Sequence, residues 1–114
     1  MNPQAKVVIL RTTGEREVHN ICHRGGDLLR WIHKQINAEY TDSVNLRDGR
    51  VMIVNDHGYE TEMVQNGQVL EIKCLKALLP VNAEATKIYQ ALCYPGTTHQ
   101  IVGDIAIAWD EDFA

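Results

Sequence analysis

The sequence predicts an α+β fold in which a mostly antiparallel sheet packs against two α-helices. Short apolar runs rich in β-branched residues recur between turn signals, which is typical of strands joined by hairpins. Two other segments, residues 27–38 and the stretch between Asn82 and Pro95, carry apolar residues at helical spacing. Because the strands follow one another in pairs, the order favours an antiparallel sheet over a doubly wound one.

The length and composition indicate one globular domain. A chain of 114 residues with 45% apolar residues can bury one ordinary core without cross-links. We expect a single α+β domain over residues 1–114, with flexible ends at 1–5 and 110–114. The acidic run Asp110–Asp112 is then a solvated tail.

The first apolar run, Lys6–Arg11, predicts a central strand because β-branched and other apolar residues fill it continuously. A turn at Gly14 leads into a second strand, Arg16–Ile21. Val18 lies on a face of this second strand that is otherwise polar, so we expect the strand at an edge of the sheet.

An amphipathic helix is predicted over roughly Asp27–Ala38. Asp27 follows a glycine break and is a candidate N-cap, and Asn37 is a candidate stop. The apolar stripe consists of Leu28, Leu29, Ile32 and Ile36. We expect this helix to cover one face of the sheet.

The dipeptide Asp48-Gly49 predicts a hairpin turn. It separates Tyr40–Leu46, which is polar and β-prone, from the apolar run Val51–Val54. The segment after that run, Asn55–Gly58, has the composition of a further turn.

Asn66-Gly67 predicts a second hairpin, between residues 62–65 and 68–72. A helix over residues 69–78 is the alternative, since apolar residues also recur there at helical spacing. We prefer the hairpin and leave residues 73–78 open.

A second helix is predicted after Pro80, which has no amide proton and interrupts any regular element. Asn82 can cap the amides that follow it, and Pro95-Gly96 ends the helix. One apolar stripe contains Ala85, Ile88, Tyr89 and Leu92.

The last strand is predicted over Ile101–Trp109. In its second part Ile105, Ile107 and Trp109 share one face, and Ala106 and Ala108 share the other. We expect this strand to form the centre of the sheet together with Lys6–Arg11 and Val51–Val54.

The patterns Leu79-Pro80-x-Asn82 and His99-x-Ile101-Val102-Gly103-Asp104 carry a resemblance to known proteins. They resemble a small phage-associated domain family of unknown function, found in tailed phages and mobile elements, often of actinobacteria. An Asn-x-x-Gly turn precedes the first pattern in that family, and Asn55-Asp56-His57-Gly58 matches it, although the spacer over residues 59–77 is longer here.

The resemblance implies a phage origin and a cytoplasmic location in the infected bacterium. The family has no established activity, so no catalytic residues carry over from it. Its motif residues are expected to serve structure, and they are Asn55, Gly58, Pro80, Asn82, Gly96, Gly103 and Asp104.

The net charge and the cysteines argue against some classes of function and indicate the compartment. A net charge of -4 and a pI near 5.7 argue against non-specific binding to nucleic acid or to an acidic membrane. No apolar run approaches the ~20 residues that span a bilayer, and residues 1–6 do not resemble a secretory leader. The three cysteines, an odd number at unrelated spacings, favour free thiols in a reducing compartment.

The segment His19–His23, which includes Cys22, is the one cluster of metal-ligand residue types. A second pair of ligands at zinc spacing is missing from the sequence, so we predict no metal and no cofactor. In a strand, Cys22 and His23 would point to opposite faces and could not act as a nucleophile and its base.

His99 with Thr97 or Thr98 and Asp104 has the residue types of a base, a hydroxyl nucleophile and an orienting carboxylate. The sequence lacks a Gly-x-Ser-x-Gly turn and offers no oxyanion hole. We therefore predict no catalytic residue and interpret these groups as parts of turns and strand ends.

A ligand site is the alternative use of these polar residues. Gly25 and Gly26 could present helix amides to an anion between Arg24 and Arg30, although no P-loop pattern follows them. The loop from Pro95 to His99 is a second possible location.

The predicted function is that of a non-enzymatic phage accessory protein that binds a host or defence-system macromolecule, most simply a host protein. The alternative is a small-ligand or nucleotide-binding protein. A small hydrolase or deaminase ranks third, because the His-x-Glu and Pro-Cys-x-x-Cys pair is missing. A homodimer could form through an unpaired edge at residues 15–21 or 62–72.

Overall fold

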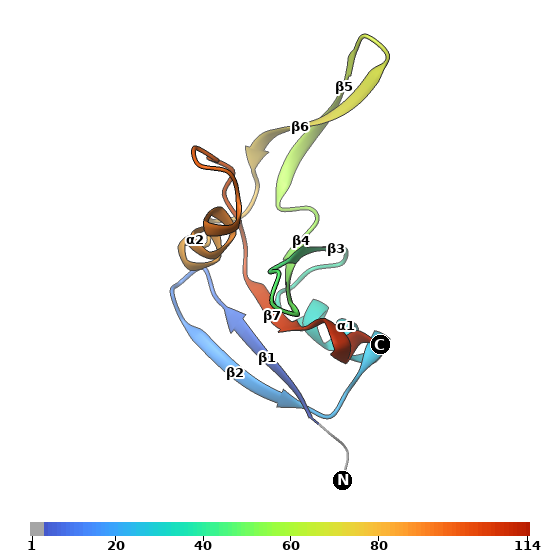
Figure 1. Cartoon of the computed structure of the whole chain (residues 1–114), viewed down its shortest axis with the longest axis vertical. Coiled ribbons are helices and arrows are strands. Elements are labelled where there is room, and N and C mark those ends of the chain that lie inside the picture. The colour runs from blue at the N-terminus through green and yellow to red at the C-terminus, as the bar shows by residue number, and fades with distance from the viewer. Residues whose placement is uncertain (1–3) are drawn as a thin grey trace.

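Five strands form the main sheet and two α-helices pack on it, while two further strands form a separate hairpin (Figure 1). The computed structural model describes residues 4–114, with the backbone but not the side chains of residues 72–75. The elements are β1 (Ala5–Leu10), β2 (Arg16–Ile21), α1 (Gly25–Gln35), β3 (Thr41–Asn45), β4 (Arg50–Asn55), β5 (Tyr59–Asn66), β6 (Val69–Ala77), α2 (Ala83–Leu92), β7 (Ile105–Trp109) and the 3-10 helix η1 (Asp110–Phe113). This arrangement confirms the predicted α+β class.

The main sheet has the order β2-β1-β7-β4-β3, and every neighbouring pair is antiparallel. The three inner strands come from the three apolar runs predicted to form the centre, and β2 lies at an edge as expected. The last strand is shorter than predicted: it begins at Ile105, and Val102 makes only an isolated bridge with Val81. Gly103 lies between Val102 and Ile105 with a φ of 80°, which turns the backbone out of the strand conformation.

Each helix buries its apolar stripe against one face of the sheet. Leu28 and Ile32 of α1 pack on the face that carries Ala106 and Ala108 of β7. The opposite face carries Ile105 and Ile107 and packs against α2. The predicted alternation of large and small residues along β7 is therefore confirmed, and it assigns one helix to each side of the sheet.

Both predicted ends of α2 and the stop at Asn37 agree with the structure, although α1 itself ends at Gln35, three residues before the predicted Ala38. Asn82 caps α2, which ends before Pro95-Gly96, and Asn37 ends α1 in a left-handed conformation with a φ of 52°. The predicted cap at Asp27 is wrong, because α1 begins two residues earlier, at Gly25. Asp27 lies in the first turn, where its carboxylate pairs with Arg30.

Both predicted hairpins are present, and each turn differs from its prediction by one residue. The loop between β3 and β4 includes Arg47 as well as Asp48-Gly49, because the Leu46 amide donates to the Arg50 carbonyl. In the other hairpin Asn66 pairs with Val69, so the turn is Gly67-Gln68. Gly67 has a φ of 67° at the first turn position, which is where a type II′ turn requires glycine.

The chain ends predicted to be flexible include ordered residues. Asp110 and Glu111 are exposed, as a solvated acidic run requires, but Asp112 is 6% exposed and pairs with Arg24 at 3.1 Å, so the expectation is wrong for Asp112. The 3-10 helix η1 packs against α1, and Asp112 of η1 neutralises the charge of Arg24, the residue before α1. At the other end Ala5 is buried in β1, and residues 1–3 lie outside the described part of the chain.

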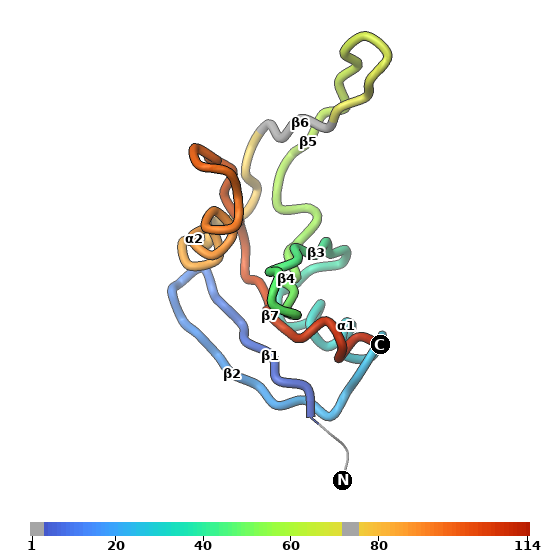
Figure 2. The backbone as a smooth tube through the Cα atoms, viewed as in Figure 1, coloured from blue at the N-terminus to red at the C-terminus, as the bar shows by residue number. Residues whose placement is uncertain are grey.

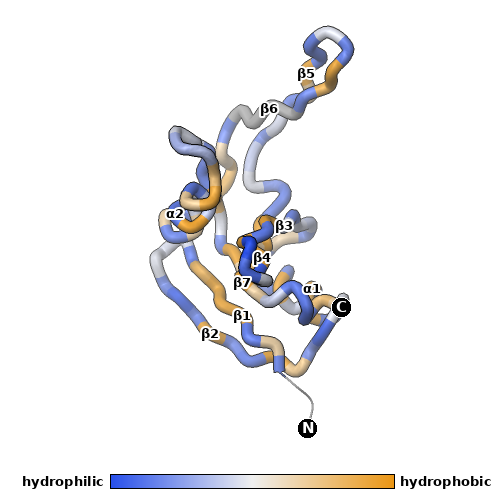
Figure 3. Tube along the Cα trace, viewed as in Figure 1, coloured by the Kyte–Doolittle hydropathy of each residue, from blue (hydrophilic) through white to orange (hydrophobic). Residues whose placement is uncertain are grey.

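The hairpin of β5 and β6 extends away from the body along the long axis of the molecule (Figures 1 and 2). The molecule measures 55 Å in that direction and 30 and 25 Å in the other two. The backbone of β6 is a strand over Val69–Ala77, so the alternative helix there is wrong. Figure 3 shows apolar segments in this hairpin as well as in the body. None of the described helices combines the length and apolar character that crossing a membrane requires.

Candidate functional site

The two sequence motifs lie side by side and are bonded to each other. The Asn82 amide donates to the Ile101 carbonyl, and the Gly103 amide donates to the Pro80 carbonyl, each at 2.8 Å. Val81 and Val102 form the isolated bridge between these two bonds. The Leu-Pro-x-Asn and Ile-Val-Gly-Asp patterns are therefore two halves of one structural junction.

Asn82 is the centre of this junction and is fully buried. Its Nδ2 donates to the carbonyl oxygens of Leu10 at 2.9 Å and Gly103 at 3.0 Å. Its Oδ1 accepts from the Ala85 amide at 3.1 Å, which is the cap of α2. The side chain thus joins β1, α2 and the loop before β7, and the sequence indicated only the cap.

Thr86 completes the junction and was not singled out from the sequence. Its Oγ1 accepts from the Ile101 amide at 2.9 Å and donates to the Ile101 carbonyl at 3.2 Å. A threonine that bonds the backbone of a distant residue has no local sequence signal. Its burial at the start of α2 fixes the loop 101–104 against the helix.

The Asn55–Gly58 turn packs against the same junction. Asn55 Oδ1 accepts from the His57 amide at 2.8 Å, and the Gly58 carbonyl accepts from the Leu78 amide at 2.8 Å. A Cβ on Gly58 would lie 2.6 Å from Cγ2 of Val102, so this position requires glycine. The turn therefore joins the base of the β5–β6 hairpin to the body.

Gly96 lies in the turn that follows the end of α2. The Thr97 amide donates to the Tyr94 carbonyl at 3.2 Å, which closes a four-residue turn around Pro95-Gly96. Gly96 has a φ of 91°, and proline followed by glycine at the two central positions is typical of a type II turn.

Asp104 belongs to an ion-pair cluster centred on Arg11. The guanidinium contacts Glu17 at 2.8 Å and Asp104 at 3.1 Å, and it donates to the carbonyl oxygen of Gln35. Asp104 also accepts from the Thr12 amide at 2.8 Å. Arg11 thus connects β2, the end of α1 and the loop before β7.

The hydrogen bonds from Arg11, followed by that from His19, lower the pKa of Glu17 to about 2 from its ordinary value of 4.5. A carboxyl whose pKa is lower in the folded state stabilises the fold at high pH, because the unfolded chain takes up the proton first. We expect this stabilisation to be complete above about pH 4.5 and to be lost as the pH falls through about 2. Urea unfolding between pH 6 and pH 2 measures it. The variant Glu17→Gln should lack this part of the pH dependence, and parallel curves for the two proteins would contradict the assignment.

The side chains of His99, Thr97 and Asp104 contact different partners. The His99 ring lies 5.2 Å from the ring of Tyr59 and 5.8 Å from that of Tyr89. Asp104 is held by Arg11, and the Thr97 hydroxyl donates to the Tyr94 carbonyl. The three residue types that suggested a catalytic set therefore have different partners.

The start of α1 is occupied by the chain's own acidic residues. Arg24 pairs with Asp112 and Arg30 with Asp27. Gly25 lies against the segment at residues 113–114, where an added Cβ would come within 3.7 Å of a carbonyl oxygen. Gly26 has open space beside it. The cations that would attract an anion to this helix end are thus already neutralised.

The His19–His23 segment has structural contacts. His19 Nε2 lies 3.0 Å from Glu17, and its ring packs edge-on against Trp31 at 5.2 Å. Cys22 is exposed and accepts a long contact of 3.7 Å from Gln4. Among the described residues, no three His, Cys, Asp or Glu side chains lie close enough together to hold a metal ion.

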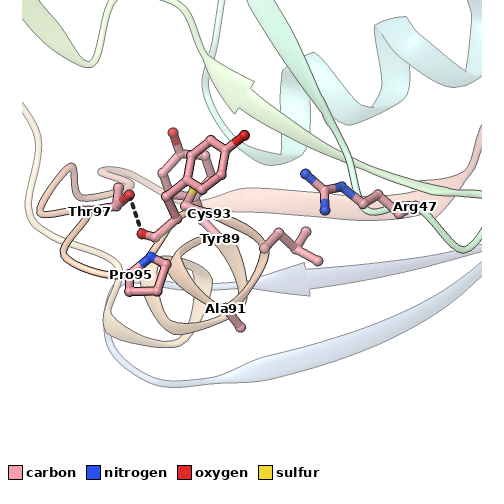
Figure 4. Close-up of a pocket in the computed structure, with 8 residues that line it drawn as sticks. Arg47, Tyr89, Ala91, Cys93, Pro95 and Thr97 are labelled. Carbon is pink, nitrogen blue, oxygen red and sulfur yellow. Dashed lines mark hydrogen bonds between the residues drawn. The ribbon is translucent and has the colours of Figure 1, made fainter.

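Two hollows lie beside the segment that follows α2, residues 93–104. One, of about 240 Å³, is lined by His99, Tyr59 and Asn55 among others. A larger one, of about 580 Å³, lies between the end of α2 and the β3–β4 loop (Figure 4). In the larger hollow, a hydrogen bond with the Cys93 thiol and burial both raise the pKa of Tyr89, so its hydroxyl stays protonated.

No protein-family model matches the chain, and neither curated proteins nor solved structures gave a match. The candidate binding surfaces of this chain are therefore identified from its sequence and structure alone.

Proposed function

We propose that the chain is a non-enzymatic phage accessory protein that binds a host or defence-system protein through the β5–β6 hairpin. The observation that carries the proposal is the exposure of this hairpin: every residue from 60 to 71 is exposed. Met63 and Leu70 are 66% and 64% exposed, and Val69 is 59% exposed. Apolar side chains gathered on one exposed element are typical of surfaces that bind other proteins.

Both faces of the hairpin carry apolar residues. Residues paired across antiparallel strands share a face, and the register pairs Gln65 with Leu70 and Asn66 with Val69. Met63 therefore lies on the face of Leu70, and Val64 lies on the face of Val69. The partner would cover at least one of these faces.

The edges of the hairpin support the same proposal. Within the described part of the chain, no third strand pairs with β5 or β6. A two-stranded hairpin without a third strand or a helix beneath it is marginally stable in water. A partner strand that adds to a free edge would bond the unpaired backbone groups and stabilise the hairpin, which is the mechanism of β-augmentation.

The polar side chains of the body favour a binding role over catalysis. Arg11, Asn82 and Asp104 each have several hydrogen-bond partners within the fold. The phage origin and the cytoplasmic location in the infected bacterium are part of the proposal, and they rest on the motif resemblance.

The test uses a photo-crosslinking amino acid at Gln68, in the exposed hairpin turn, in host cells. We expect a defined adduct that is lost in the double variant Met63→Thr/Leu70→Thr. The hairpin contacts the body little, so the variant should keep its stability to within about 0.5 kcal/mol.

The control variant is Val18→Thr, which removes an exposed apolar residue from the edge strand β2 and should leave the adduct unchanged. A crosslinker at Asn20, also in β2, should give no such adduct. An adduct that persists in the double variant, or that forms equally from Asn20, would rule the hairpin out. An adduct of twice the chain mass, together with a dimer in light scattering, would assign the hairpin to self-association instead.

A further inference from the structure

We propose that the hollow between the end of α2 and the β3–β4 loop binds a small anion that carries a flat ring, the chemical class of a nucleoside monophosphate. Arg47 would hold the anionic group, and Tyr94 would stack on the ring. This surface is separate from the β5–β6 hairpin, so the inference does not depend on the proposed function.

The size and charge of the hollow define the class of ligand. A volume of about 580 Å³ lies in the range of about 300–1,000 Å³ that small-molecule sites occupy. The Arg47 guanidinium is the one fully charged group among the residues that line it, and no carboxylate lines it. An anion is therefore favoured over a cation.

Arg47 differs from the arginines that serve the fold. Arg11, Arg24, Arg30 and Arg50 each pair with a carboxylate, whereas Arg47 makes no ion pair with any described residue. Figure 4 shows its side chain extending from the β3–β4 loop toward Tyr89, across the hollow. A guanidinium without a carboxylate partner keeps its donors free for a phosphate or carboxylate of a ligand.

The backbone of Arg47 is in an unfavourable conformation. Its φ is 68°, a left-handed value that costs free energy for any residue with a side chain. Its amide donates to Asn45 Oδ1 at 2.8 Å, and this bond helps to hold the conformation. Strained residues of this kind occur frequently at ligand sites, and here the strained residue carries the free cation.

Two tyrosines supply the apolar wall. Tyr94 is 91% exposed, so its ring is available for stacking with a ligand ring. The Tyr89 ring lines the same hollow, and its hydroxyl is hydrogen-bonded to Cys93. An arginine and a tyrosine ring beside one hollow match a ligand with both a negative group and a flat ring.

The first experiment titrates the full chain with AMP, adenosine and inorganic phosphate by calorimetry. We expect AMP to bind about tenfold or more tightly than either adenosine or phosphate, because only AMP engages both groups. Phosphate binding as tight as that of AMP would overturn the role of the tyrosine ring. No heat from AMP at millimolar concentration would overturn the site.

The second experiment separates binding from folding with the variant Arg47→Gly. Glycine accepts a φ of 68° without strain, so the melting temperature should stay the same or rise while AMP affinity falls about tenfold. Arg16→Ala, in β2, removes another arginine that makes no ion pair with a described residue, and it should change AMP affinity less than about twofold. Equal affinity of the wild type and Arg47→Gly would overturn the proposal.

Tyr94→Ala should also weaken AMP binding severalfold, and Tyr40→Ala, a change at another exposed tyrosine, should not. The hairpin variant Met63→Thr/Leu70→Thr should bind AMP like the wild type. A failure of the anion site and a failure of the hairpin proposal therefore give different results.

Discussion

Replacing Asn82 by leucine is expected to lower the free energy of unfolding by about 3 kcal/mol, as measured by urea denaturation. The variant loses the cap of α2 and leaves the carbonyl oxygens of Leu10 and Gly103 without the amide donor that they share. Leucine has as many side-chain heavy atoms as asparagine and a larger volume, so the substitution leaves no cavity. A decrease of this size is a large part of the total stability of a small domain.

Two further variants divide this effect into its parts. Asn82→Asp keeps the acceptor for the Ala85 amide but turns a second oxygen toward the two carbonyl groups, so it should be about as destabilising as leucine. Asn20→Leu, at an exposed position of β2, is the control and should change the stability by less than about 0.5 kcal/mol. If Asn82→Asp were as stable as the wild type, the bonds to Leu10 and Gly103 would contribute nothing.

Replacing Gly58 by alanine is expected to cost about 2 kcal/mol, because the added methyl group overlaps a buried side chain. The new Cβ would lie 2.6 Å from Cγ2 of Val102 and 3.4 Å from the carbonyl oxygen of Asn55. Val102 is 4% exposed and branched at Cβ, so it cannot rotate away easily. Thermal or urea unfolding measures the change.

The matched control is Gly26→Ala, since Gly26 lies in α1 with no atom within 4 Å of an added Cβ. This change should be neutral or should stabilise the protein by about 0.5–1 kcal/mol. The variant Val102→Ala removes the clashing methyl group, so Gly58→Ala should cost less in that background than in the wild type. Strictly additive costs would contradict the contact as the cause.

The sequence predicted the elements that depend on local periodicity. The alternation along β7 and the stripes of the two helices follow from neighbouring residues, because burial on one face imposes a period of 2 or 3.6. The turns were located less well. At Asn66-Gly67 the dipeptide indicated the hairpin, but glycine occupies the first turn position here and not the second.

The junction and the larger hollow depend on residues that are far apart in the chain. Arg11 and Asp104 form an ion pair across 93 positions, and Arg47 lines the same hollow as Tyr89 and Tyr94, which come much later in the chain. No local pattern marks such pairs. The expectation of a solvated tail at Asp112 was wrong for the same reason, since its partner Arg24 lies at the start of α1.

The position of β7 has a consequence for the order in which the chain can fold during synthesis. This strand lies between β1 and β4, yet it is made after both of them. Until Ile105–Trp109 leaves the ribosome, the β1–β2 and β3–β4 hairpins have no common partner, and the inner edges of both are free to associate with other chains. The main sheet should therefore assemble only after translation has passed β7, and chaperones that cover exposed strand edges would act on the nascent chain before that point.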